Sequence, residues 1–208
     1  MPPVHVVSHP LVVDRLTRMR DAATPSETFR RLMRECGALL AYEACRSLPT
    51  ALVSVTTPLC TVQLSRLTGP APVVLSVLRA GNGLLDGVLD VLPHAGVAHL
   101  GLYRDHETLR PVEYSFKYPL DIAERPVIVV DPMLATGHSA VAALARVAAL
   151  GVKDLRFIAL VAAPEGVAVL SAAYPHVELT VAGLDSHLNE RGYIVPGLGD
   201  AGDRLYGT

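Results

Sequence analysis

Four short runs of the chain are apolar at nearly every position, with no alternation of polar and apolar residues. A strand that is apolar on both faces is typical of a parallel sheet that has helices packed against both of its sides. Parallel strands also need long connections between them, which are usually helical. The four runs are "PVVLSVL" from Pro72, "VIVV" from Val127, "RFIALVAA" from Arg156 and "VELTVAGL" from Val177.

Other segments repeat their apolar residues every three or four positions, which predicts helices. The clearest covers residues 26–46, where Ser26 is a candidate N-cap. Shorter helices are predicted over residues 84–91, 139–150 and 166–174. The pattern therefore predicts an α/β fold with an open, mostly parallel sheet flanked by helices.

Composition excludes several classes of protein. The chain has 208 residues, half of them hydrophobic, which fits a single domain over residues 1–208. The formal net charge of -2 argues against a nucleic-acid or membrane-surface partner. Charged residues interrupt the longest apolar stretch, and the N-terminus does not resemble a secretory signal, so we expect a cytoplasmic protein. The three cysteines form no C-x-x-C pair, which favours free thiols.

In an open α/β sheet, ligands bind beyond the carboxyl ends of the strands. The first strand end reads "VLRAGNGLLDG", in which Arg79 is a cation beside a glycine-rich turn, a combination that suits a pyrophosphate. The glycines partly match a dinucleotide-binding motif, but Gly87 comes one position late. An ordinary strand-to-helix turn and a dinucleotide-dependent oxidoreductase are therefore both open at this point.

The stretch "VIVVDPMLATGHS" indicates a sugar-phosphate site. Asp131 follows the buried strand, and small polar residues then lead into a helix, whose first N–H groups are free to bind a phosphate. No G-K-[ST] is present, so a Walker loop is not indicated. A carboxylate for sugar hydroxyls beside a phosphate-binding loop predicts a ribose 5-phosphate site.

Two further segments complete the candidate site. Residues 105–118, which follow Arg104, mix charged and aromatic residues and suggest a mobile hairpin. The C-terminal "ERGYIVPGLGDAGDRLYGT" is glycine-rich, which argues against a helix or strand there. Its backbone groups near Gly199 suit the edge of a base, and Asp200 and Asp203 suit a divalent cation.

These segments, in this order, resemble the uracil phosphoribosyltransferases. The similarity extends over essentially the whole chain, and its specific part is the combination of "VVDPMLATGHS" with "GYIVPGLGDAGDRLYGT". It implies the type I phosphoribosyltransferase fold, with a small hood and a flexible hairpin over the site. It also implies conversion of uracil and phosphoribosyl pyrophosphate (PRPP) to uridine monophosphate (UMP) and diphosphate in pyrimidine salvage, with Mg²⁺ as cofactor.

The resemblance further implies a homodimer or homotetramer and regulation by a nucleotide effector such as GTP. It assigns pyrophosphate to Arg79 and Arg104, and magnesium, held mostly through PRPP, to Asp200. The implied catalytic residues are Arg79, Arg104, Asp131 and Asp200. The implied PRPP-binding set adds Pro132, Met133, Leu134, Ala135, Thr136, Gly137, His138 and Ser139, and the implied uracil-binding set is Ile194, Gly199, Asp200 and Ala201.

His138 departs from the family pattern, which usually has a small residue at that position. We expect its side chain to point outward, and the alternative is an added donor to the 5-phosphate. A catalytically silent regulator that binds PRPP or nucleotides is the alternative to the enzyme. Retention of both arginines and both ends of the site argues against that regulator.

Overall fold

The computed structural model describes residues 4–104 and 111–208. Its main sheet has the strand order β1-β10-β9-β7-β4-β5-β6, with the short β8 paired to β9. Every neighbouring pair is parallel except β5 and β6. The strands are β1 Val4–Val6, β4 Val73–Leu78, β5 Gly96–Arg104, β6 Pro111–Lys117, β7 Val127–Val130, β8 Met133–Leu134, β9 Leu155–Ala162 and β10 Glu178–Leu184.

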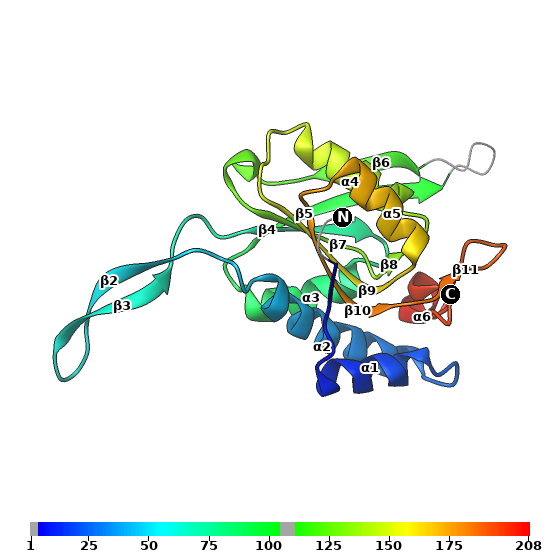
Figure 1. Ribbon diagram of the computed structural model, residues 1–208, viewed down its shortest axis with the longest axis horizontal. Coiled ribbons are helices and arrows are strands. Elements are labelled where there is room, and N and C mark those ends of the chain that lie inside the picture. The colour runs from blue at the N-terminus through cyan, green and yellow to red at the C-terminus, as the bar shows by residue number, and fades with distance from the viewer. Residues whose placement is uncertain (1–3, 105–110) are drawn as a thin grey trace.

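Helices cover both faces of this sheet, as Figure 1 shows. One face carries α1, α2 and α3, with α6 beside α2, and the other carries α4 and α5. The helices are α1 Pro10–Arg20, α2 Ser26–Ala44, α3 Asn82–Val91, α4 His138–Ala148, α5 Pro164–Ala173 and α6 Ala201–Tyr206, and a 3-10 turn spans Ile122–Glu124. None of the helices in the described ranges is both long and apolar enough to cross a bilayer.

The unbroken apolar strands have a simple explanation in the two layers of helices. In β7, Ile128 and Val130 pack into the core beneath α1–α3, whereas Val127 and Val129 pack into the core beneath α4 and α5. All four side chains are fully buried. Burying each one contributes roughly 1.5–3 kcal/mol, so the strand is a rigid support for the residue that follows it.

The predicted helices and strands are confirmed within a few residues, with three corrections. Ser26 is the first residue of α2, and Pro25, in an extended conformation, is its N-cap, so the capping prediction was wrong. The C-terminal stretch does contain a strand, β12 (Ile194–Val195), and a helix, α6. Residues 111–117, predicted as part of a mobile hairpin and not as a packed element, form β6, a strand paired with β5 at the edge of the main sheet; residues 105–110 lie outside the described ranges.

Tertiary packing explains why α6 forms despite its glycine-rich sequence. Asp200 caps the helix, because its Oδ1 accepts a 3.0 Å bond from the N–H of Asp203. Ala201 and Leu205 are buried and belong to the core that α2 and α3 share. Burial of this face outweighs the low helix propensity of Gly202.

Two small antiparallel pairs lie outside the main sheet. Strands β2 (Thr50–Thr56) and β3 (Thr61–Leu67) form a hairpin that extends away from the body of the protein (Figure 1). Strand β11 (His187–Leu188) pairs with β12 and forms part of a small hood beside α6. The sequence patterns above predicted neither hairpin.

Candidate active site

A cavity of about 360 Å³ opens at the carboxyl ends of β4 and β7. The C-terminal segment closes its other side, so residues that are far apart in sequence meet there. Its lining comes from the turn after β4, the loop after β7, the hood and the start of α6. The lining residues are Ala80, Asp131, Met133, Ala135, Arg191, Gly192, Tyr193, Ile194, Gly199, Asp200, Ala201 and Gly202.

Asp131 lies directly beyond β7 and faces the cavity. Its backbone N–H donates to the carbonyl of Ile158, which extends the sheet by one hydrogen bond and fixes the direction of the side chain. One carboxylate oxygen, Oδ1, accepts a long 3.4 Å bond from the N–H of Met133. Burial raises the pKa of this carboxyl to about 7, and the Met133 bond opposes that rise only in part. A carboxyl group with a raised pKa thus faces the cavity.

The loop after Asp131 is held tightly from behind by α5. Gly137 caps α4 with φ +82°, a conformation that favours glycine, and it is buried. A Cβ on Gly166, in α5, would overlap the backbone carbonyls of Leu134 and Ala135. The loop therefore has little room to move, and the N–H groups in the first turn of α4 have no partners within the helix. Such a turn, held in place by its packing, is suited to bind an anion.

Arg79 lies after β4 and extends toward α6. Its Nη2 is 3.9 Å from Oδ1 of Asp203, and its guanidinium carbon is 5.7 Å from the centre of the Tyr206 ring. The Tyr206 hydroxyl donates a 3.1 Å bond to the carbonyl of Arg79. More than half of the Arg79 side chain is exposed, so the guanidinium is available to an incoming anion.

The structure brings most of the predicted site residues to one place. Thr136 lies next to the lining residue Gly192: its Cγ2 is 3.9 Å from the place that a Cβ on Gly192 would occupy. Pro132, Leu134 and Gly137 are buried in the loop, while His138 and Ser139 are exposed at the start of α4. Arg104 ends β5, and the predicted role of its side chain lies outside the described part of the structure. The predicted residues in the lining are Asp131, Met133, Ala135, Ile194, Gly199, Asp200 and Ala201.

Five residues of the lining are outside the predicted binding sets: Ala80, Arg191, Gly192, Tyr193 and Gly202. Ala80 and Gly202 border the cavity through their position beside Arg79 and Asp200, and no signal marks their small side chains. Arg191 is a cation in the hood. Its position next to the glycine-rich segment was the available signal, since an isolated arginine in a loop often binds an anion.

Comparison with known proteins connects this geometry to a family. A family model described as uracil phosphoribosyltransferase matches residues 6–208. A uracil phosphoribosyltransferase from Rhizobium etli (strain CIAT 652) is 56% identical over 205 residues, which cover 99% of this chain and 98% of that relative. A uracil phosphoribosyltransferase from Brucella anthropi is 55% identical, and the match covers 99% of each chain.

Solved structures agree on the fold. A protein from Aquifex aeolicus superposes with a TM-score of 0.92 at 35% identity, with 98% of each chain covered. An adenine phosphoribosyl transferase from Trypanosoma brucei superposes with a TM-score of 0.58 at 12% identity, covering 88% of this chain and 84% of that one, which shows a shared fold alone. The predicted type I phosphoribosyltransferase fold is confirmed.

Proposed function

Because the chain belongs to the uracil phosphoribosyltransferase family, we propose that it transfers the phosphoribosyl group of PRPP to uracil, giving UMP and diphosphate. The observation that carries this proposal is a single cavity lined by Asp131, the loop after it, and the backbone of residues 199–202. A carboxylate suited to sugar hydroxyls, a loop suited to a phosphate and a backbone suited to a base are thus adjacent. The direct test is chromatographic detection of UMP from uracil, PRPP and Mg²⁺ with the purified protein.

In this proposal Asp131 and the following loop bind the ribose 5-phosphate part of PRPP. An ionised Asp131 accepts hydrogen bonds from the ribose hydroxyls, and charged acceptors form the stronger bonds. The N–H groups at the start of α4 bind the 5-phosphate, assisted by the helix dipole. Since β7 and α5 fix this loop, the sugar is oriented before reaction, which removes part of the entropic barrier.

Uracil is proposed to bind against the C-terminal segment. Gly199 has φ +72°, and the next two residues start α6, so backbone N–H and C=O groups border the cavity there. Ile194 is nearly fully buried and supplies an apolar wall for the flat ring. Main-chain groups fixed in this way can read the polar edge of one base and orient its nitrogen toward the anomeric carbon.

Displacement at the anomeric carbon moves negative charge onto the leaving diphosphate and positive charge onto the ribose. Arg79, which is exposed and directly precedes the lining residue Ala80, and Arg104 are proposed to stabilise the leaving diphosphate. Preorganised charges of this kind contribute a few kcal/mol each to the transition state. This reaction requires no Ser-His-Asp arrangement, and we propose no catalytic role for the histidines.

Magnesium is proposed to arrive with PRPP and to be held by few protein atoms. Among residues 4–104 and 111–208, no cluster of three or more His, Cys, Asp or Glu side chains could hold a metal ion by itself. One carboxylate together with the phosphates of PRPP suits Mg²⁺, which usually keeps several waters and binds one or two carboxylates together with substrate phosphates. Asp200 faces the cavity and uses Oδ1 for the helix cap, so Oδ2 can contribute to such a site. When bound, Mg²⁺ would neutralise diphosphate charge.

The glycines after β4 have a packing role that accounts for them without a dinucleotide. A Cβ on Gly87 would overlap the backbone carbonyl of Arg34 in α2, and a Cβ on Gly83 would overlap the sulfur of Met33. These glycines therefore allow α3 to approach α2 closely. This packing removes the need for a dinucleotide to explain the glycines, and the family membership supports the transferase over both the oxidoreductase and the silent regulator.

A methyl group added at Gly166 is expected to weaken PRPP binding about 10- to 100-fold, although alanine favours helix formation. The new Cβ overlaps two backbone carbonyls of the phosphate-binding loop, so the loop has to shift. Calorimetric titration of Gly166→Ala with PRPP measures the effect. The matched control is Ala168→Gly, at an exposed position of the same helix, which lowers helix propensity without touching the loop. Unchanged affinity in Gly166→Ala would contradict the assignment of the loop.

We also propose that the chain self-associates through the β2–β3 hairpin. The hairpin stands away from the main sheet, and Leu52, Leu59, Leu64 and Leu67 are exposed on it. A two-stranded hairpin is marginal by itself, and exposed apolar patches mark contact sites. Sedimentation should show a dimer or tetramer, and a Leu52→Asp/Leu64→Asp variant should dissociate into folded monomers. An unchanged oligomer would remove the hairpin from the interface.

Other implications of the resemblance stay predictions. They are regulation by a nucleotide effector such as GTP, a cytoplasmic location and a role in pyrimidine salvage. We also propose that residues 1–208 act as one domain, since both apolar cores pack on the same sheet. The exposed side chain of His138 agrees with an outward direction, and its role toward the 5-phosphate is tested below.

A further inference from the structure

Arg20 and Asp185 form a nearly buried ion pair outside the cavity. Arg20 is the last residue of α1, and Asp185 follows the end of β10. Nη2 of Arg20 lies 2.6 Å from Oδ1 of Asp185, and Nη1 lies 2.9 Å from Oδ2. The Asp185 side chain is only 4% exposed. Two parallel N–H···O bonds of this kind fix both side chains in one geometry.

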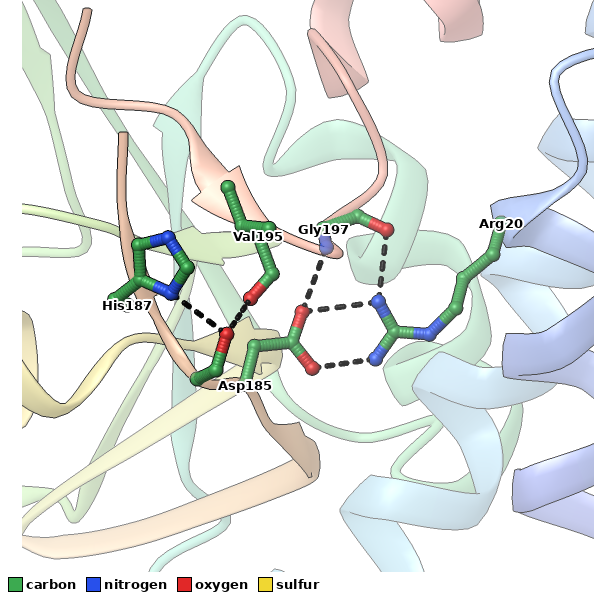
Figure 2. A network of polar contacts seen from close by, with 6 residues as sticks. Arg20, Asp185, His187, Val195 and Gly197 are labelled. Carbon is green, nitrogen blue, oxygen red and sulfur yellow. Dashed lines mark hydrogen bonds and ion pairs between the residues drawn. The ribbon is translucent and has the colours of Figure 1, made fainter. Parts of the chain in front are cut away.

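The same pair binds both polar groups of Gly197, as Figure 2 shows. Nη1 of Arg20 donates a 2.8 Å bond to the Gly197 carbonyl, and the Gly197 N–H donates a 2.9 Å bond to Oδ2 of Asp185. Gly197 has φ +62°, and a Cβ there would overlap the carbonyl of Ile194. The backbone at Gly197 is therefore held by two hydrogen bonds in a conformation that favours glycine.

A glycine in the sheet makes room for this pair. A Cβ on Gly183, in β10, would lie 3.0 Å from the Leu16 side chain and 3.3 Å from Nη2 of Arg20. Glycine usually weakens a strand interior, and it often marks a close approach by another group. Here the approaching groups are the Leu16 side chain and the Arg20 guanidinium, both from α1, so Gly183 lets α1 pack closely against β10.

A second arginine holds the next residue of the segment. Nη1 of Arg204, in α6, donates a 2.9 Å bond to the carbonyl of Leu198, and it also donates to the carbonyl of Met19 near the end of α1. Its guanidinium carbon lies 4.4 Å from the centre of the Phe29 ring. Carbonyls 197 and 198 are thus both tied, through arginines, to the C-terminal turn of α1. The cavity lining resumes at the very next residue, Gly199.

We propose that Arg20 and Asp185 are positioning residues for uracil: they hold Gly197 so that the backbone of residues 199–201 meets the base in a fixed geometry. This rests on the proposed function. The pair contacts neither the loop after Asp131 nor Arg79 in the hydrogen bonds of the described residues. Its effect should therefore fall mainly on the base, and on PRPP only to the smaller extent that Asp200 contributes through Mg²⁺.

Steady-state kinetics of Asp185→Asn and Arg20→Lys separate positioning from general stability. In each variant KM for uracil should rise about 10- to 100-fold, because a small misplacement of a binding group has effects of that size. The Kd for PRPP, from calorimetry, should stay within about three-fold of the parent. Lysine keeps the charge of Arg20 but cannot form the paired bonds, so it tests geometry apart from charge.

Glu35→Gln is the matched control. Glu35 pairs with Arg15 of α1 at 2.7 Å, so its loss weakens the packing of the same helix without touching Gly197. It should leave KM for uracil unchanged. Hydrogen exchange of the peptide covering residues 194–201 should accelerate in Asp185→Asn and not in the control.

Each remaining outcome overturns the inference. Equal losses for uracil and PRPP, no loss for either, or the same rise in the control would assign the pair to general stability. Failure of both variants to fold would do the same. Absence of UMP formation by the parent protein would instead contradict the proposed function, so the two failures are distinguishable.

Discussion

Replacing Asp131 with asparagine is expected to lower kcat/KM for PRPP about 100- to 1,000-fold while the protein stays folded. The ionised carboxylate accepts bonds from ribose hydroxyls, and hydrogen bonds to a charged group contribute roughly 1.5–3 kcal/mol each. Asparagine keeps the shape of the side chain but has one acceptor oxygen and no charge. Initial rates at varied PRPP and saturating uracil measure the loss. Near-normal activity in this variant would contradict the proposed role of Asp131 in PRPP binding.

The same substitution should change the pH dependence of PRPP binding. Burial raises the pKa of the Asp131 carboxyl to about 7 in the free protein. The fraction of ionised carboxylate therefore rises with pH through that range, and PRPP affinity should rise with it. PRPP has ionisable phosphates of its own, so the informative quantity is the difference between the parent and Asp131→Asn. His138→Gly should keep the parent profile, whereas an altered profile would show that the imidazole contacts the 5-phosphate.

The raised pKa also predicts the direction of a stability change. An unfolded aspartate titrates near about 3.9. Between that value and about 7 the folded protein binds more protons at Asp131, so the free energy of unfolding falls as pH rises through this window. An asparagine side chain does not ionise, so the variant does not lose this stability. As pH rises from about 4 to about 8, the free energy of unfolding of Asp131→Asn should therefore increase by roughly 1–3 kcal/mol relative to that of the parent. This figure is set below the full effect of the pKa shift because the Asp131 side chain is partly exposed. Denaturant unfolding at both pH values checks the sign.

The second large effect is expected at Arg79. Arg79→Ala should lower kcat/KM for PRPP about 100-fold and weaken inhibition by diphosphate, because the exposed guanidinium proposed to bind the diphosphate is lost. The Tyr206 bond uses the Arg79 backbone carbonyl, so it survives the substitution. Diphosphate inhibition constants and PRPP rates measure the two effects.

Asp203→Asn provides the matched control for Arg79. It removes the carboxylate that lies 3.9 Å from the guanidinium and leaves the arginine in place. The Asp203–Arg79 pair is exposed and weak. Asp203 is absent from the cavity lining, and the cation role that the sequence suggested for it is not part of the proposed site, so this variant should retain activity within a few-fold. If Asp203→Asn lost as much activity as Arg79→Ala, the ion pair, and not the free cation, would be the functional element.

Strand periodicity predicted the part of the fold that supports the site. The apolar run before Asp131 required a sheet covered on both faces, and the structure has helices on both. A carboxylate directly after such a run was a local signal, so Asp131 could be found from sequence. The turn after β4 was equally readable, because Arg79 and its glycines are contiguous.

Residues whose role depends on distant partners could not be found in that way. Arg20 and Asp185 are 165 positions apart, and the local sequence around either residue does not indicate its partner. Asp185 does follow an apolar strand, as Asp131 does, and that shared position was the available signal. The helix at 201–206 was missed because burial against α2 offsets the cost of its glycine. The β2–β3 hairpin was missed because its strands pair only with each other and lie outside the main sheet.

This cavity is proposed to join uracil, and no other free base, to the ribose of PRPP. The direct measurement is a panel of uracil, cytosine, adenine, hypoxanthine, guanine and orotate, each incubated with PRPP and Mg²⁺ and assayed for nucleotide by chromatography. We expect UMP from uracil at a rate that Asp131→Asn and Arg79→Ala both lower, with little or no nucleotide from the other bases. A purine nucleotide or orotidine monophosphate as the main product, or bound PRPP with no product from any base, would contradict it.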